Sequence, residues 1–205
     1  MKNKAICEAN SHIYLPPVGI GRIAKMEPSH DTATHDSIDA PTVQAAAAGD
    51  RSALREIYEA TSDRVFRLMA RMVGVQDADD LTQQVYMQAF SKLSQFSGDS
   101  KFETWLYRLA TNEALQHLRR EKHRRTSELV VEPTTRQNDS VEQGERSQFV
   151  RQALAALDPE LRAIFTLKEE HGLSYQEIAN TLDIREGTVG SRLNRARREL
   201  RKMLT

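Results

Sequence analysis

The spacing of apolar residues is the feature that most constrains the fold of this chain. Between residues 50 and 125, and again between 148 and 205, apolar side chains recur mostly every three or four positions. That spacing places them on one face of an α-helix. No stretch of useful length alternates apolar with polar residues, which is the pattern of a half-buried strand. We therefore predict an all-α fold.

The helical pattern falls into two blocks, residues 44–125 and 148–205. Residues 126–147 between them contain Pro133, Gly144 and an acidic excess, and they predict a flexible acidic linker too short for a further folded domain. Residues 1–43 are rich in proline and polar residues, and they predict a disordered extension. Met26 leaves open a later start of translation. The expected architecture is two small helical domains.

Turn and capping residues predict where helices begin and end in the first block. Asp50 and Asp77 are expected to cap the N-termini of two helices, and Gly74 is expected to end the first of them. A loop over residues 94–101 should then precede a long helix from residue 102 to about residue 125.

The overall charge balance, 29 Lys and Arg against 29 Asp and Glu, hides strong segregation. Residues 185–202 hold seven basic and two acidic residues, whereas residues 127–147 hold two basic and five acidic ones. A nucleic-acid partner is therefore compatible with zero net charge. The single cysteine, Cys7, excludes an internal disulfide. No apolar run approaches the roughly 20 residues of a membrane span, so we expect a cytoplasmic protein without membrane insertion.

The C-terminal block has the pattern of a helix-turn-helix. Ser174 and Glu177 form a capping box before a short amphipathic helix, and a brief turn leads into a strongly basic last helix. The apolar residues of that last helix occupy one face, so its polar residues should point toward a DNA groove. The alternative is a solvated basic face on an ordinary bundle helix.

Residues 96–116 form a second constellation, in which aromatic and basic side chains interleave. Phe96, Phe102, Trp105 and Tyr107 lie close in sequence to Lys101 and to further basic residues. A separated DNA strand is bound by such a mixture, through base stacking and phosphate attraction. The alternative is that the aromatic residues simply form core.

Residues 96–116 and the helix-turn-helix pattern together resemble the sigma-70 family. The resemblance is to its extracytoplasmic-function group in particular, which keeps two conserved domains. FSGDSKFETWLYRLATNEALQHLRR is similar to sigma domain 2, and LSYQEIANTLDIREGTVGSRLNRARREL is similar to sigma domain 4. The resemblance implies a factor that binds core RNA polymerase, recognises the −10 and −35 promoter elements and promotes transcription initiation. It implies no cofactor and no metal, and the family commonly has an anti-sigma factor.

The resemblance also implies roles for individual residues. Contact with the clamp helices of the largest polymerase subunit is implied for Asp77, Asp80, Leu81, Gln84 and Phe90. Binding of the −10 element is implied for Ser97, Gly98, Asp99, Ser100, Lys101, Trp105, Arg108, Asn112, Gln116, Arg119 and Arg120. Binding of the −35 element is implied for Thr188, Ser191, Arg192, Asn194, Arg195 and Arg198. Gly190 and Asn194 depart from the residues common in relatives, so the −35 preference is expected to differ.

Two other classes of protein compete with this interpretation. A conventional regulator would use only the helix-turn-helix and would leave residues 96–116 without a function. An enzyme would need a reactive centre, but the six histidines and one cysteine show no zinc-ligand spacing, and no glycine-rich phosphate loop is present in the sequence. We expect a protein that is not an enzyme.

Overall fold

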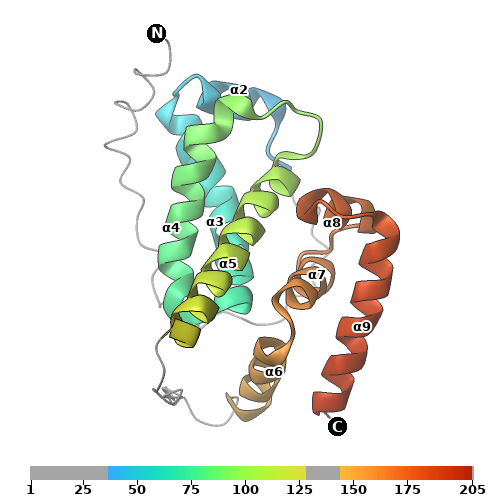
Figure 1. The fold of residues 1–205 in the computed structure, drawn as a ribbon. Helices are drawn as coiled ribbons and strands as arrows, with labels where there is room; N and C mark the ends of the chain where they lie inside the picture. The colour runs from blue at the N-terminus through green and yellow to red at the C-terminus, as the bar shows by residue number, and fades with distance from the viewer. Residues whose placement is uncertain (1–36, 128–143, 205) are drawn as a thin grey trace.

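The structure is a computed structural model that describes residues 37–127 and 144–204, and every regular element within those ranges is helical. The N-terminal domain contains α2 (Ala40–Ala47), α3 (Arg51–Val73), α4 (Val75–Lys92), the short 3-10 helix η3 (Leu93–Gln95) and α5 (Phe102–Ser127). The C-terminal domain contains α6 (Gly144–Ala156), α7 (Pro159–Glu169), α8 (Tyr175–Leu182) and α9 (Glu186–Leu204). Figure 1 shows the two groups of helices side by side.

Local signals fix most of the helix ends. The carboxylate of Asp50 accepts hydrogen bonds from the backbone N–H groups of Ser52 and Ala53, which confirms the predicted cap of α3. Gly74 ends α3 with a φ of 97°, a conformation that favours glycine. Ser174 and Glu177 form the predicted capping box at the start of α8.

Two predicted boundaries were wrong. Asp77 does not cap α4, because Gly74 joins α3 directly to α4 and the helix already begins at Val75. Asp77 lies in the first turn of α4, where its negative charge still complements the helix dipole. Helix α2 begins at Ala40, inside the segment predicted to be disordered. Asp39 caps this helix and Pro41 occupies its first turn, where a proline is tolerated because no N–H partner is needed.

The linker prediction is tested only at its ends. Helix α5 continues to Ser127 and α6 begins at Gly144, so helix replaces both ends of the predicted linker. Residues 128–143 lie outside the described residues, as do residues 1–36 with Cys7. In the described ranges, no helix is long and apolar enough to cross a membrane.

Helices α3, α4 and α5 form a three-helix bundle around large buried side chains. Ile57, Met69, Tyr86 and Leu106 are almost fully buried. Tyr86 keeps its hydroxyl satisfied through a 2.7 Å hydrogen bond with the hydroxyl of Thr61. This pairing avoids the cost of a buried polar group without a partner.

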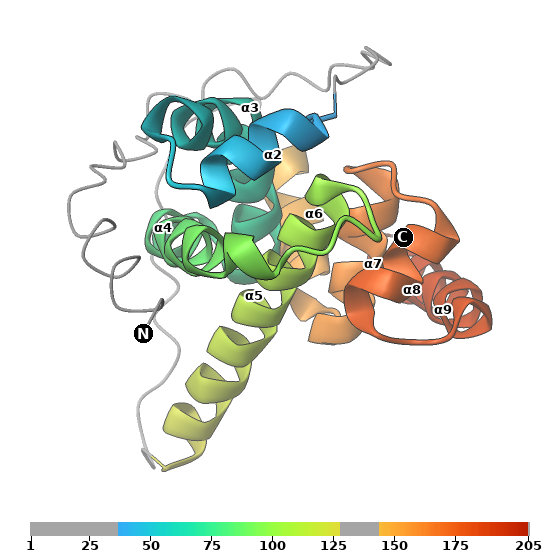
Figure 2. The same ribbon diagram turned by 90° about the horizontal axis from the view of Figure 1, so that it is seen from above.

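The two domains pack against each other, which the sequence did not predict. Helix α8 lies beside α5, and α7 packs on α3 (Figure 2). Ile164, Leu167 and Ile178 of the C-terminal domain belong to the same buried cluster as the core of the N-terminal bundle. A second, smaller cluster around Leu154, Leu157 and Leu200 fixes α6 to α9. The N-terminal bundle therefore shares its main apolar cluster with α7, α8 and α9, whereas α6 packs in the second cluster.

Candidate nucleic-acid interface

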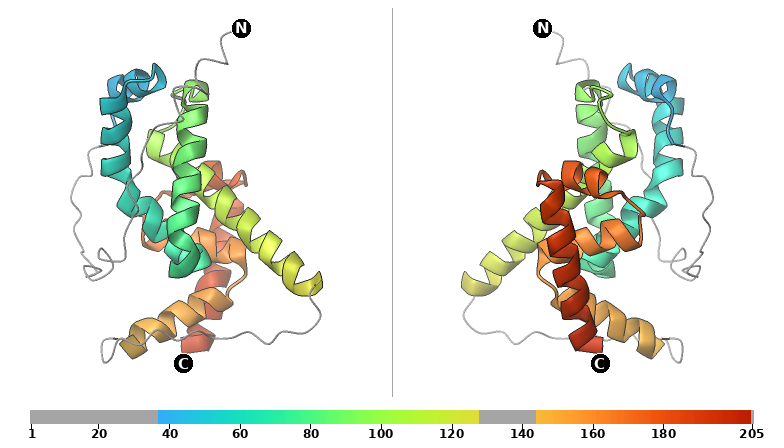
Figure 3. Two further views of the ribbon diagram at one scale, coloured as in Figure 1. Left: turned by 90° about the vertical axis from the view of Figure 1, so that its left-hand side faces the viewer. Right: turned by 90° about the vertical axis from the view of Figure 1, so that its right-hand side faces the viewer.

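One face of α5 gathers the residues predicted to bind the −10 element. Trp105, Arg108, Asn112, Gln116 and Arg119 are spaced by three or four positions, so they follow one side of the helix. Trp105 is half-buried, and the other four are exposed. The C-terminal half of α5 extends away from the other helices (Figure 3). The helix thus presents a continuous polar and basic strip.

Aromatic packing fixes the start of this strip. The ring of Trp105 lies 5.5 Å from that of Phe96 and 5.7 Å from that of Phe102, measured between centroids. Phe102 is buried, which confirms the core interpretation for this ring, and Leu106, one turn later in α5, is buried as well. Trp105 combines a packed side with a partly exposed one. A base could therefore stack on an indole that is already held in place.

The loop before α5 is ordered by its own side chains. Gly98 has a φ of 82°, which a residue with a side chain rarely adopts. The hydroxyl of Ser97 donates a 2.6 Å hydrogen bond to the carboxylate of Asp99. Ser100 donates to the carbonyl of Lys101. Both hydrogen bonds join residues of the loop itself.

Glu113 is a functional candidate that the sequence did not reveal. Its side chain is buried on the inner side of α5, and one oxygen accepts a 2.7 Å bond from Arg120 while the other accepts a 2.6 Å bond from Gln88 of α4. Glu113 therefore holds Arg120 in one position beside the exposed strip. The only sequence signal is a carboxylate among the apolar positions of a helix.

Helix α9 divides cleanly into a buried and an exposed side. Val189, Leu193, Ala196 and Leu200 are buried against the rest of the domain. The predicted DNA-facing residues Ser191, Asn194, Arg195 and Arg198 are exposed, and Thr188 and Arg192 are half-exposed. The hydroxyl of Ser191 donates to the carbonyl of Thr188 one turn earlier.

Carboxylates already pair with the central arginines of this face. Arg192 lies 2.7 Å from Glu160 at the start of α7, and Arg195 lies 2.8 Å from Glu199. The bond to Glu199 raises the pKa of Arg195, so its guanidinium stays charged. Sequence reasoning identified the arginines but missed Glu160, because the contact joins residues 32 positions apart.

Helix α4 carries the residues predicted to contact polymerase, but they do not share one surface. Asp77, Asp80 and Gln84 are exposed. Leu81 and Phe90 are only 3% and 8% exposed and pack into the bundle, whereas a direct contact with polymerase would need exposed side chains. Their positions follow the apolar period of α4, which directs them to the core.

Met87 is an exposed apolar residue that the prediction missed. It is 65% exposed and lies three positions after Gln84, on the same side of α4. Asp80, Gln84 and Met87 together form the exposed strip of this helix. Helical spacing from Asp80 was the signal that could have identified Met87.

Comparison with known proteins relates this arrangement to a family. The model of Sigma-70 region 2 matches residues 57–124, and the model of Sigma-70 region 4 matches residues 149–200. The chain is 32% identical over 170 residues to the ECF RNA polymerase sigma factor SigW of Bacillus subtilis, covering 76% of this chain and 91% of that protein. The chain belongs to the extracytoplasmic-function group of the sigma-70 family. It is a sigma factor for transcription initiation by RNA polymerase, with a DNA-binding helix-turn-helix in region 4, and it is not an enzyme.

Other relatives agree with this membership. The sigma factor is 35% identical to ECF RNA polymerase sigma factor SigE of Mycolicibacterium smegmatis, covering 89% of this chain and 75% of that one. It is 33% identical to the ECF RNA polymerase sigma-E factor of Escherichia coli, covering 73% of this chain and 85% of that one.

Solved structures share the fold of this sigma factor. The sigma factor RpoE of Bartonella quintana, in complex with the anti-sigma factor NepR, matches with a TM-score of 0.60 at 22% identity, covering 73% of this chain and 95% of that one. CnrH in complex with the cytosolic domain of CnrY matches with a TM-score of 0.61 at 22% identity, covering 82% and 97%.

Proposed function

We propose that this sigma factor divides promoter recognition between α5 and α9 and binds core polymerase through α4. The observation that carries the proposal is the exposed strip of α5, where Trp105, Arg108, Asn112 and Gln116 line up beside an ordered loop. Base stacking needs a fixed aromatic ring, phosphates need positive charge, and a base edge needs paired donors and acceptors. The strip supplies all three for a separated −10 strand.

The exposed side of α9 fits the major groove and the −35 element. Arg195 and Arg198 are exposed on a helix whose opposite side is fixed in the domain. An arginine fork can bind the O6 and N7 acceptors of guanine together, and this contact distinguishes guanine from other bases. Asn194 and Ser191 add shorter polar side chains to the same surface.

We infer that core polymerase binds the exposed strip of α4. Asp80 and Gln84 offer polar contacts, and Met87 offers an adaptable apolar one. We assign this strip to the clamp helices of the largest polymerase subunit, and we place the protein with its polymerase in the cytoplasm. An anti-sigma factor is a further proposed partner, since two proteins of the same fold are solved as complexes of that kind or with a cytosolic domain of another protein.

The test is run-off transcription with purified core polymerase on a library of promoter sequences. We expect initiation to select defined −10 and −35 sequences. Asn112→Ala with Gln116→Ala should relax selection at −10 alone, and Arg195→Ala should relax it at −35 alone. Arg55→Ala on the exposed side of α3 is the matched control and should leave both preferences unchanged. Initiation that ignores the library sequence, or a −35 effect from the α5 variant, would contradict the assignment.

A further inference from the structure

Glu113 links α5 to α4 from a buried position. Its side chain is 8% exposed, on a stretch of α5 where Ala110 and Ala114 are buried as well. One carboxylate oxygen accepts a 2.6 Å hydrogen bond from the side-chain amide of Gln88 in α4, and the other accepts a 2.7 Å bond from the guanidinium of Arg120. Because both oxygens have a donor, the cost of burying this carboxylate is offset.

Arg120 is the exposed partner of this carboxylate. Its side chain is 63% exposed, and it lies in the C-terminal half of α5, the half that extends away from the other helices (Figure 3). In addition to the bond to Glu113, its Nε–H group donates to the backbone carbonyl of Gln116 at 3.4 Å. The guanidinium is thus held at two points, next to a residue proposed to read a −10 base. Its other N–H groups have no partner within residues 37–127 and 144–204.

The pair of Glu113 and Arg120 is suited to fixing a position more than to adding stability. Solvent screens an exposed guanidinium, so the pair contributes little to the free energy of folding. An apolar side chain at position 113 would fill the same buried space without a charge that needs partners. The carboxylate instead supplies a fixed anchor, because Gln88 holds it from α4. A long side chain that is fixed beforehand loses less freedom when it binds a ligand.

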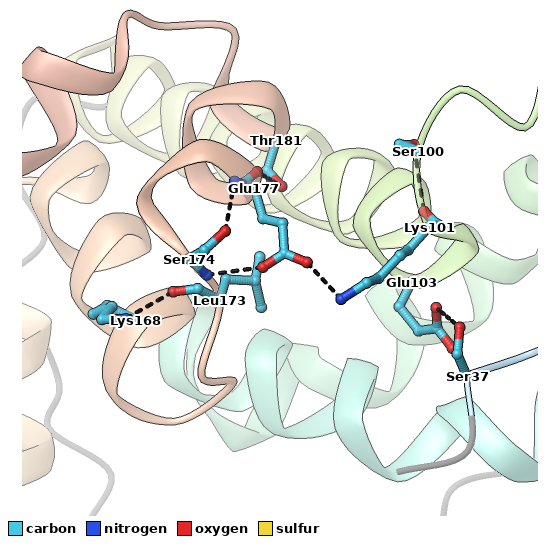
Figure 4. Close-up of polar contacts among 9 residues, drawn as sticks. All are labelled: Ser37, Ser100, Lys101, Glu103, Lys168, Leu173, Ser174, Glu177 and Thr181. Carbon is cyan, nitrogen blue, oxygen red and sulfur yellow. Dashed lines mark hydrogen bonds and ion pairs between the residues drawn. The ribbon is translucent and has the colours of Figure 1, made fainter. Parts of the chain in front are cut away.

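Two other cations on or near the −10 surface have more exposed partners. Lys101 lies 2.9 Å from Glu177 of α8 (Figure 4), and Arg124 lies 2.9 Å from Glu121. The side chains of these two glutamates are 27% and 30% exposed, against 8% for Glu113. A carboxylate in contact with water can move with its cation or release it. Of these three carboxylates, Glu113 is the one that the fold holds in place.

We propose that Glu113 is a positioning residue for promoter binding. It fixes the guanidinium of Arg120 beside Gln116, and the remaining N–H groups of Arg120 bind a backbone phosphate of the separated −10 strand. Every nucleotide carries a phosphate, so a base held by Asn112 and Gln116 brings one to this side of α5. A planar guanidinium binds two phosphate oxygens at once. The inference deepens the proposed function and rests on the binding of the −10 strand by α5.

Substitution of Glu113 separates positioning from simple electrostatics, because the two predict opposite signs. Removal of a negative charge near DNA should raise the affinity if charge alone matters. Positioning predicts that Glu113→Gln weakens binding by about two- to tenfold, the cost of ordering one long side chain on binding. The probe is a fluorescein-labelled single-stranded DNA that carries the −10 sequence selected from the promoter library. Fluorescence anisotropy would measure its affinity for the full-length protein with core polymerase, and a rise in affinity would overturn the proposal.

A double-mutant cycle shows whether Glu113 acts through Arg120. Arg120→Ala should weaken binding at least as much as Glu113→Gln, and the double variant should bind no more weakly than Arg120→Ala alone. If Glu113 only supports the bundle, its loss should instead add to that of Arg120→Ala. An additive cycle, or unchanged binding by Arg120→Ala, would therefore contradict the proposal. Glu113→Met, with an apolar side chain of similar length, takes the place of Glu113→Gln if the buried amide unfolds the protein.

Glu121→Gln is the matched control, because it removes a more exposed carboxylate from an arginine of the same helix. Its affinity for the probe should stay the same or rise slightly. A fall equal to that of Glu113→Gln would mean that any carboxylate of α5 has this effect, and the proposal would be wrong.

A measurement without DNA separates the role of Glu113 from the proposed function. NMR relaxation of the Arg120 Nε–H group in the free protein should show a side chain more rigid than exposed Arg108, and Glu113→Gln should remove the difference. Equal mobility of the two arginines in the unsubstituted protein would overturn the positioning role. With core polymerase, equal binding of selected and scrambled strands would contradict the proposed function itself. Selective binding with an additive cycle would overturn the role of Glu113 alone.

Discussion

The imidazole of His171 and the phenol of Tyr107 meet across the domain interface, with Nδ1 and the hydroxyl oxygen 3.2 Å apart. Burial, together with the nearby guanidinium groups of Arg67 and Arg64, lowers the pKa of His171 from 6.5 to about 3. The Nε2 atom is buried without a hydrogen-bond partner in the described residues. The charged form of the ring is therefore strongly disfavoured while the two domains are packed together.

This pair predicts that mild acid weakens the packing of the two domains. If exposure to water restores a pKa near 6.5 to His171, its contribution to the packing is fully present above that pH and is lost as the pH falls toward 3. At pH 5.5 the loss is about 1.4 kcal/mol, a change of roughly tenfold in the ratio of packed to unpacked protein. Energy transfer between dyes on the two domains would measure the ratio from pH 7.5 to 5.5. His171→Gln should flatten this response, and a pH response unchanged by His171→Gln would exclude this histidine.

Charge reversal at the Arg71–Glu170 pair should weaken the packing of the two domains. Both side chains are about a quarter exposed, so solvent screens the pair and its contribution should be about 0.5–1 kcal/mol. Arg71→Glu should raise the fraction of protein with unpacked domains by a few fold in the same energy-transfer measurement. The double variant with Glu170→Arg should return most of the way to the original protein. Equal fractions of unpacked protein in the single and double variants would show that the charges do not interact.

Arg195→Ala should lower initiation mainly at promoters with the preferred −35 sequence. A two-pronged arginine–guanine contact contributes about 1–3 kcal/mol of discrimination, whereas a phosphate contact weakens all sequences alike. The measurement is the ratio of initiation on matched and −35-scrambled templates. Arg201→Ala, near the end of α9, should cost little and show no sequence preference. An Arg195→Ala protein with the original ratio and a lower melting temperature would favour a packing role.

Glu160→Gln should strengthen the binding of DNA regardless of sequence. The substitution removes the carboxylate 2.7 Å from Arg192 and leaves that guanidinium available to phosphate. One additional phosphate contact should steepen the dependence of log affinity on log salt by about one. Fluorescence anisotropy with specific and scrambled duplexes at several salt concentrations would measure both effects. A gain confined to the specific duplex would instead assign Arg192 to base contact.

Gly190→Ala should stabilise the helix-turn-helix. A Cβ atom at this position would lie 3.6 Å from the ring of Tyr175, an ordinary contact, and alanine favours a helix over glycine by up to about 1 kcal/mol. The melting temperature should rise by a few degrees. Gly49→Ala is the contrasting variant, because its φ of 95° strains any residue with a side chain, and it should lower the melting temperature. A fall in melting temperature for Gly190→Ala would mean that α8 and α9 need a closer approach there.

The sequence by itself determined where most helices form and which side of α5 and of α9 is exposed. Those features depend on backbone bonds and side-chain positions within a few residues, as in the capping box of Ser174 and Glu177 and the apolar stripe of α9. Where the prediction failed locally, a single residue decided the outcome. Gly74 joins α3 directly to α4, so α4 begins at Val75 and Asp77 does not cap it.

Only the tertiary structure decided how the two domains meet. Arg162 and Met72 are 90 positions apart, and Arg71 and Glu170 are 99 apart. No local pattern selects such partners, because the contact depends on which two apolar surfaces face each other after the helices have formed. The same holds for Glu113, whose buried carboxylate joins Arg120 to Gln88 of another helix. Buried polar groups need partners wherever the fold supplies them, and those partners become visible only once the helices are packed.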